Sequence, residues 1–100
     1  MITVTIKKEQ DHFTSIQISG HAMYADYGKD IVCSAVSSIA ITTVNAILAL
    51  SLNSISYQVN DQGLLIEITK QDETTEILLG NMIAMLKELE QKYPKNIKVR

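Results

Sequence analysis

The stretch from Ile31 to Leu50 carries no charged side chain, and this run most constrains how the chain can fold. A helix of this length is long enough to cross a bilayer. At about 100° per residue, however, one side of that helix carries a polar stripe of Ser34, Ser38, Thr42 and Asn45. Lipid would not satisfy this stripe, and the far flank lacks the Lys and Arg anchors of a membrane span. We therefore expect a mostly buried helix and no membrane partner.

One β-hairpin is predicted before this helix and another after it. Before it, apolar side chains alternate on both arms of a polar turn, at Ile2, Val4, Ile6, Phe13, Ile16 and Ile18, and the second arm ends near Gly20. After it, a strand around Tyr57 and Val59 and another from Leu64 to Ile68 are joined by a turn over 60–63. Both segments have the period of two that is typical of strands.

A second helix is predicted from Asp72, a helix-capping residue, to a stop imposed by Pro94. Glu73 and Glu76 suit the positive end of its dipole. Apolar side chains recur at helical spacing at Leu78, Met82, Met85, Leu86 and Leu89. We expect Met82 and Met85 to fill gaps in the core. Ile97 and Val99 then indicate a short last strand.

The resulting element order is ββαββαβ, which predicts an α+β fold. We expect two layers, a mixed or antiparallel sheet with both helices packed on one face, and a single domain over residues 1–100. A chain with 46% hydrophobic residues suits one core. Because a core of this size leaves much surface exposed, a homodimer is expected. The order of the strands across the sheet does not follow from the pattern.

Charge and cysteine usage exclude several functions. Nine basic and eleven acidic residues give a net charge of -2 without a basic run, and the chain has no tryptophan. Direct binding of nucleic acid is therefore not expected. The single cysteine, Cys33, cannot form an intramolecular disulfide, and residues 1–8 do not look like a signal peptide, so a cytoplasmic protein is expected. One cysteine and two histidines make no closed zinc set.

Cys33 is the first candidate for chemistry. It lies three residues after Asp30, the expected N-cap, and therefore in the first turn of the predicted helix. Helix N-termini and neighbouring imidazolium groups are settings that lower the pKa of a cysteine and favour the nucleophilic thiolate. His21 lies in a loop that also contains Gly20 and Gly28, so the loop can fold back and bring imidazole to sulfur.

Each of these residues also has a structural interpretation. Cys33 can be a small buried hydrophobe, and His21, like His12, can be a solvated side chain. Asp30 can orient the histidine or bind substrate, or simply cap its helix. Ser37, one turn beyond Cys33, can hydrogen-bond the histidine or substrate, or its own i−4 carbonyl.

Two short motifs resemble the ribosomal-processing cysteine protease family, Prp. They are Gly20-His21-Ala22, followed by Gly28, and Asp30-Ile31-Val32-Cys33, followed by Val36-Ser37. The resemblance extends over essentially the whole chain. It implies that Cys33 and His21 are the catalytic pair and that Gly20, Asp30 and Ser37 match other positions of the family's motif.

The resemblance also implies a substrate. Such proteases trim a short N-terminal extension from a protein of the large ribosomal subunit, cut next to phenylalanine, and need no metal or organic cofactor. Ser34 departs from the alanine that similar proteins commonly have beside the nucleophile. We expect residues 22–29 to close over the peptide, with Gly28 as a hinge and Tyr24 and Tyr27 against the substrate phenylalanine.

Two other functions stay open on the sequence alone. One is a ribosome-associated adaptor that binds peptide without cutting it, and the other is a structural homodimer with a buried Cys33. A catalytic thiol should alkylate in the folded protein, whereas a structural one should react only on unfolding.

Overall fold

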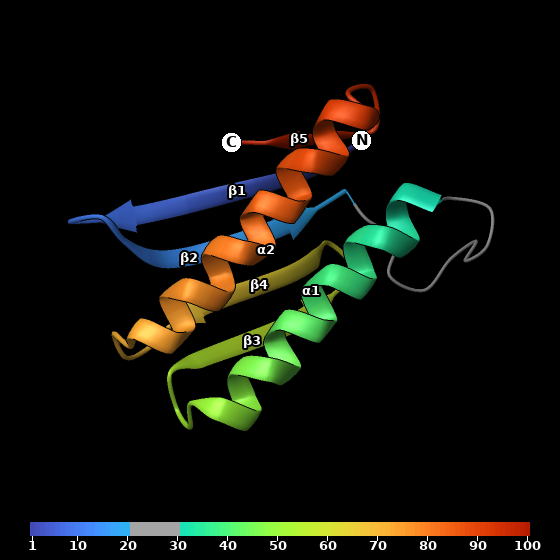
Figure 1. Ribbon diagram of the computed structural model, residues 1–100. Helices are drawn as coiled ribbons and strands as arrows, with labels where there is room; N and C mark the ends of the chain where they lie inside the picture. Colours follow the sequence, from blue (N-terminus) through green and yellow to red (C-terminus); the bar gives the residue numbers. More distant parts are fainter. Residues whose placement is uncertain (21–30) are drawn as a thin grey trace.

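Five strands form one mixed sheet in the computed structural model, which describes residues 1–20 and 31–100 (Figure 1). The strands are β1 (Ile2–Glu9), β2 (His12–Ser19), β3 (Ile55–Asn60), β4 (Gly63–Ile68) and β5 (Ile97–Val99). Their order across the sheet is β3-β4-β2-β1-β5, in which β1 and β5 are parallel and the other neighbours antiparallel. The two hairpins are therefore joined edge to edge by β2 and β4, a pairing that the sequence did not reveal.

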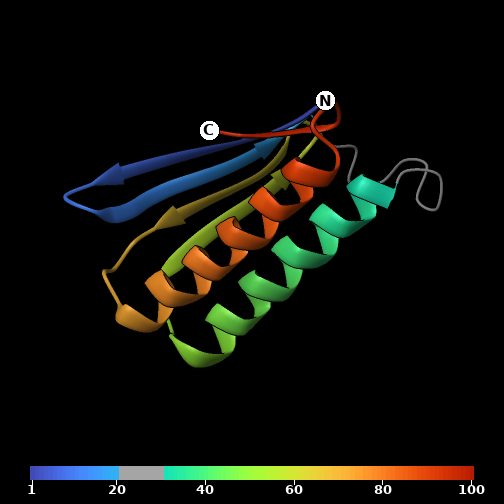
Figure 2. The same cartoon turned by 45° about the horizontal axis from the view of Figure 1, so that its top comes forward.

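Two helices, α1 (Ile31–Leu50) and α2 (Glu73–Lys92), lie side by side on one face of this sheet. They run in opposite directions, and the other face of the sheet is left uncovered (Figures 1 and 2). The predicted α+β class and the two-layer arrangement are confirmed.

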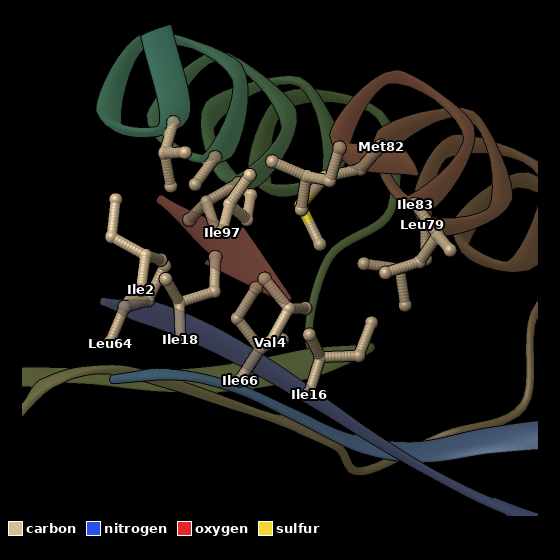
Figure 3. Packing of buried hydrophobic residues seen from close by; sticks show 14 of the residues in the cluster. Ile2, Val4, Ile16, Ile18, Leu64, Ile66, Leu79, Met82, Ile83 and Ile97 are labelled. Carbon is tan, nitrogen blue, oxygen red and sulfur yellow. The ribbon is translucent and has the colours of Figure 1, made fainter. Parts of the chain in front are cut away.

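The core lies between the sheet and the helices. Alternation along the strands places Ile2 and Val4 of β1, Ile16 and Ile18 of β2, and Leu64 and Ile66 of β4 on the covered face (Figure 3). They pack against fully buried side chains of both helices, among them Val36, Ile47, Leu79, Met82 and Leu86. Burial of each such side chain contributes about 1.5–3 kcal/mol, so this layer is the main source of stability.

α1 touches the sheet along one side only. Only 33% of its most apolar window is buried, so the prediction of a mostly buried helix was wrong in degree. The predicted polar stripe does face solvent, with Ser34, Ser38, Thr42 and Asn45 exposed. Among the described residues α1 is the one helix long and apolar enough to span a membrane, a test that the core helix of a globular protein also passes.

α2 begins and ends where the sequence indicated. The Asp72 carboxylate accepts a hydrogen bond from the backbone N–H of Thr75, and Tyr93 follows the last helical residue. Met82 is fully buried as predicted, but Met85 is 41% exposed, so its predicted place in the core was wrong. The buried arc of α2 extends from Met82 toward Leu79, Leu86 and Ile83, and Met85 lies about 60° from Met82 on the other side, beyond the edge of that arc.

Candidate functional site

Cys33 is a buried residue in the first turn of α1. The backbone N–H groups of that turn have no acceptor within the helix, and they form the positive end of its dipole. The first turn of α1 contains no acidic side chain. The sulfur therefore belongs to a part of the helix whose field favours negative charge.

The end of β2 lies at the same end of the molecule as the start of α1 (Figure 1). Gly20 follows β2 directly and has a φ of +74°, in the left-handed region that favours glycine. A Cβ at this position would also collide with the carbonyl group of Met1. Glycine is thus required here by the backbone itself, and it turns the chain out of the sheet just before His21.

Five of the predicted site residues lie outside the described part of the chain: His21, Tyr24, Tyr27, Gly28 and Asp30. Of the others, Cys33 and Ser37 lie one helical turn apart on the same side of α1, and Gly20 ends β2. Ser37 is half-buried, whereas Ser34, next to Cys33, is exposed.

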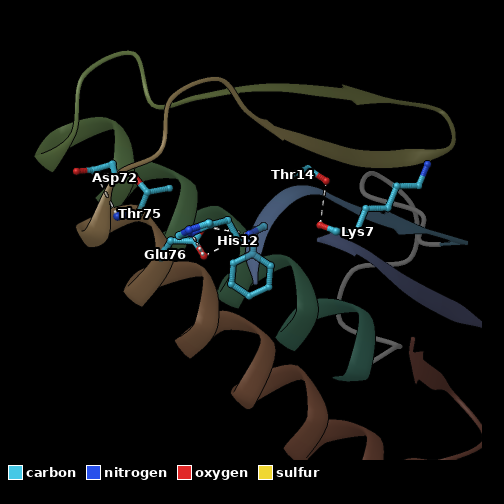
Figure 4. Close-up of polar contacts among 7 residues, drawn as sticks. Lys7, His12, Thr14, Asp72, Thr75 and Glu76 are labelled. Carbon is cyan, nitrogen blue, oxygen red and sulfur yellow. Dashed lines mark hydrogen bonds and ion pairs between the residues drawn. The ribbon is translucent and has the colours of Figure 1, made fainter. Parts of the chain in front are cut away.

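His12, the second histidine of the chain, lies at the opposite end of β2 from Gly20. Eight residues in a strand span roughly 25 Å. His12 Nδ1 lies 3.8 Å from Glu76 Oε1, and that carboxylate also accepts the backbone N–H of Phe13 at 3.2 Å (Figure 4). The His12 side chain is 42% exposed, in agreement with the predicted solvated position, and the hydrogen bond from Phe13 to Glu76 joins the first hairpin to α2.

A polar cluster closes the first turn of α2, at the same end of the sheet as His12. Asp72 accepts hydrogen bonds from the backbone N–H of Thr75 and from the Thr75 hydroxyl, whose oxygen lies 2.8 Å from Asp72 Oδ2 (Figure 4). The Ser51 hydroxyl donates a further hydrogen bond to the same carboxylate. The hydrogen bond from Ser51, followed by that from Thr75, lowers the pKa of the Asp72 carboxyl below its ordinary value of 3.8. These polar groups serve the fold.

Three hollows open along the described residues of α1. The first, of about 330 Å³, is lined by Ser34, Ser37, Ser38, Ile41 and Thr42. The second, of about 220 Å³, lies between α1 and the β3–β4 hairpin and is lined by Ile41, Val44, Asn45, Tyr57, Val59 and Leu64. The third, of about 240 Å³, lies between α1 and α2 and is lined by Ser38, Ile39, Thr42, Thr43, Asn81 and Met85. The sequence analysis predicted none of them. For the second hollow a signal was available, because the alternation of Ile55, Tyr57 and Val59 puts all three side chains on one face of β3.

These positions suit nucleophilic chemistry at Cys33. A thiolate there would be stabilised by the first-turn N–H groups, and the same groups can donate to an oxyanion formed on an attacked carbonyl. The adjoining hollow exposes small hydroxyl side chains and Ile41, a lining that accommodates a peptide rather than a charged ligand.

Comparison with known proteins gives matches along the whole chain. The family model for cysteine protease Prp matches residues 1–98. The ribosomal processing cysteine protease Prp of Staphylococcus aureus is 31% identical over 103 residues, which cover 99% of this chain and 97% of that protein.

Solved structures give the same result. A crystal structure of the essential ribosomal processing protease Prp from S. aureus, with a covalently linked product peptide, superposes with a TM-score of 0.89 at 29% identity. A second structure of that protease, with a substrate peptide, gives a TM-score of 0.88 at 30% identity. Each match covers 100% of this chain and 98% of the other.

Proposed function

The chain belongs to the cysteine protease Prp family, and from this premise we propose that it removes a short N-terminal extension from a protein of the large ribosomal subunit. The cut is made next to phenylalanine. The S. aureus relatives support this proposal, because they are ribosomal processing proteases and one of them holds a product peptide in covalent linkage. Residues 1–100 form the protease as a single cytoplasmic domain.

Cys33 is the nucleophile in this proposal. A cysteine protease needs a reactive thiol, and the chain contains one cysteine. Its place in the first turn of α1 is the observation that carries the proposal, because a helix N-terminus stabilises the thiolate. A buried structural thiol needs no such position.

His21 is the general base and acid. The chain has only two histidines, and His12 lies beside Glu76 at the far end of β2. His21 follows Gly20, whose backbone turns the chain out of the sheet at the end where α1 begins. Asp30 and Ser37 support the pair, and Gly20 sets the path of the chain.

In the proposed reaction the thiolate attacks the scissile carbonyl, and the negative charge moves to the carbonyl oxygen. Backbone N–H groups of the first turn of α1, that of Cys33 among them, stabilise this oxyanion. Protonated His21 gives its proton to the departing amine, and a thioester remains on Cys33. Water then attacks the thioester, His21 takes its proton, and the thiolate leaves. The chain supplies every group that these steps use, so no cofactor is required.

Tyr24, Tyr27 and Gly28 complete the proposed substrate site. The tyrosine rings bind the substrate phenylalanine, and Gly28 lets their segment close over the peptide. The three residues lie outside the described part of the chain, so their role rests on the sequence.

We also propose that the protein is a homodimer. Ile41 and Leu48 of α1 are exposed, and exposed Leu50 and Leu52 extend this apolar surface to the end of the helix and just past it. Light scattering at micromolar concentrations tests this, and a strictly monomeric mass would reject it.

One experiment tests the protease proposal directly. The purified protein is incubated with a ribosomal-protein precursor that carries its extension, and intact masses are followed with time. We expect the loss of one N-terminal peptide with phenylalanine beside the cut, and no loss with Cys33→Ala. A folded wild-type protein that binds the precursor without cutting it would instead be an adaptor.

A further inference from the structure

The last residues of β2 lead directly into the segment that contains His21. Ser19 is the final residue of the strand, and only Gly20 separates it from the proposed base. One residue spans at most about 3.6 Å of chain, so a displacement of Ser19 passes almost undiminished to the start of that segment. The contacts that hold Ser19 in place therefore decide from where the chain reaches His21.

Neighbouring strands hold Ser19 on both sides. It pairs with Thr3 of β1 and with Gly63 of β4, and its hydroxyl donates a hydrogen bond of 3.5 Å to the Thr3 carbonyl. The contact of Gly20 with Met1 extends the support on the β1 side by one residue. On the β4 side, the pair of Ser19 with Gly63 is the last one, so the support there depends on Gly63.

Gly63, the first residue of β4, lies very close to the backbone of β2. A Cβ at this position would lie 1.9 Å from the carbonyl oxygen of Ile18 and 3.2 Å from the Cα of Ser19. Its φ of +128° is also one that side chains rarely adopt. Atoms in contact lie about 3.5 Å apart, so a side chain at Gly63 would open this contact by more than about 1 Å.

The turn before Gly63 would give way more easily than β2. Ile18 is fully buried in the core, whereas residues 60–62 of the turn are exposed. A side chain at Gly63 would therefore push the turn outward and break its pair with Ser19. The end of β2 would then be supported by β1 alone.

We propose that Gly63 is a positioning residue for His21. By admitting the close contact of β4 with Ile18 and Ser19, it fixes the direction in which β2 leads the chain to the proposed base. This inference rests on the proposed function. Gly63 has no side chain and acts only through the backbone of Ser19 and Gly20. A misplacement of about 1 Å can lower turnover roughly 100-fold, so the contact is close enough to matter.

The alternative is that Gly63 serves only the turn between β3 and β4. The same turn contains a second stabilising contact, in which the backbone N–H of Gln62 donates to the side-chain oxygen of Asn60 at 2.8 Å. Asn60→Ala removes this hydrogen bond without placing an atom against β2. It is therefore the matched control for Gly63→Ala.

The first test compares turnover in these two variants. Both are assayed on the extended precursor at a temperature where circular dichroism shows each to be folded. We expect Gly63→Ala to lower kcat roughly ten- to 100-fold, because the base is no longer aligned. KM should stay nearly unchanged, and Asn60→Ala should retain the kcat of wild type.

The second test needs no substrate. Alkylation of Cys33 at mildly acidic pH depends on the imidazolium that stabilises its thiolate. Gly63→Ala should therefore slow alkylation roughly three- to tenfold at that pH, and the rates should converge at alkaline pH. In a His21→Ala background the same substitution should have no further effect, because the residue through which Gly63 acts is gone.

A pair of variants in β4 replaces Gly63→Ala if that variant does not fold. Leu64 pairs with Ile18 beside the close contact, and Ile66 pairs with Ile16 further along the strand. Both side chains are buried, so Leu64→Ala and Ile66→Ala each leave a cavity under β4. Leu64→Ala alone should lower kcat, by about tenfold, and an equal loss in both would overturn the proposal.

Three further outcomes overturn the proposal. The first is the kcat of wild type in folded Gly63→Ala. The second is an equal loss of kcat in Asn60→Ala, which would assign the effect to the turn. The third is slower alkylation caused by Gly63→Ala in the His21→Ala background. A wild-type protein that cuts no precursor overturns the proposed function instead, and the alkylation test still decides whether Gly63 acts through His21.

Discussion

The first turns of the two helices, as far as the structure describes them, carry different side chains. At the start of α2, the carboxylate of Asp72 accepts the N–H of Thr75, and Glu76 accepts the N–H of Phe13 from β2. Acidic side chains thus occupy the positive end of that helix. The first turn of α1 has none, and it holds Cys33 instead.

This difference separates a helix end that serves the fold from one available to chemistry. The field at the start of α2 is already neutralised by Asp72 and Glu76, which tie the helix to Ser51 and to the first hairpin. At the start of α1 the same field acts on a sulfur atom. Under the proposed function, two helices of equal length would thus serve different purposes because of the residues in their first turns.

The largest effect is expected from the reactive pair at the α1 end. Cys33→Ala and His21→Ala should each lower kcat by at least about 1000-fold, because each removes a group that takes part in bond making or proton transfer. The double variant should be little worse than either single one. Turnover of the extended precursor measures these losses, and circular dichroism checks that the fold survives.

The α2 end provides the contrast for that experiment. Asp72→Ala, compared at a temperature where it is folded, should retain wild-type kcat. Full activity of folded Cys33→Ala, or a 1000-fold loss of kcat in Asp72→Ala, would contradict the proposal that the start of α1 serves catalysis and the start of α2 serves the fold.

The next prediction compares the effect of glycine-to-alanine substitutions at Gly20 and Gly80 on the free energy of unfolding. Gly20→Ala should lower the free energy of unfolding by about 1–3 kcal/mol, because Gly20 has a positive φ and its Cβ would meet the carbonyl of Met1. Gly80 is in α2, and a Cβ there meets nothing within 4 Å. Gly80→Ala should raise the free energy of unfolding by about 0.5–1 kcal/mol. Urea denaturation measures both, and two shifts of the same sign would contradict the argument.

A smaller effect is expected when α1 is made to resemble α2. Ser34→Asp puts a carboxylate in the first turn of α1, where it should stabilise the helix by about 0.3–1 kcal/mol. The same charge repels the thiolate of Cys33, so alkylation at neutral pH should slow by roughly three- to tenfold. At alkaline pH, where the thiol is fully ionised, the alkylation rates should converge.

Two controls accompany Ser34→Asp. Thr74→Asp adds the same charge to the first turn of α2, and Ser38→Asp adds it one turn further along α1. Neither should slow alkylation several-fold, and equal slowing in all three variants would point to net charge rather than position.

The smallest effect is a pH dependence at the α2 end. The pKa of Asp72 is lowered in the folded protein, chiefly by the hydrogen bond from Ser51. The ionised carboxylate therefore stabilises the folded protein fully at pH values above its unfolded pKa of 3.8, and this stabilisation is lost as the pH falls through the folded pKa. The melting temperature of Asp72→Asn should therefore lie below that of wild type at pH 7 and 5, and the gap should narrow at pH 3. A gap that stays constant down to pH 3 would show that the charge of Asp72 contributes nothing.

Much of the fold was predictable because its signals are local. The bounds of α1, the two hairpins and the cap at Asp72 follow from period, charge and turn residues within a few positions. The strand order and the contact of His12 with Glu76 were not predictable, because they join segments far apart in the chain. The exposure of Met85 depends on where α2 lies on the sheet, which periodicity alone does not give.

The candidate site divides in the same way. The place of Cys33 in the first turn of a helix, and the need for glycine at Gly20, could be predicted or matched from short motifs. The hollow between α1 and the β3–β4 hairpin could not be predicted, because it depends on how far α1 lies from β3, an edge strand that follows it in the chain. His21 and its neighbours remain predictions from the sequence.

The parallel pairing of β5 with β1 bears on when such an enzyme becomes active during its own synthesis. Ile97 pairs with Ile2 and is fully buried, so β1 is completed by residues made almost a whole chain later. Contacts of such sequence separation form slowly, because a long loop must close first. Until residues 97–99 have left the ribosome, β1 lacks its neighbour β5 and one of its edges is unpaired. Met1, which lies against Gly20, directly precedes this strand. The nascent chain should therefore stay inactive until translation has passed β5.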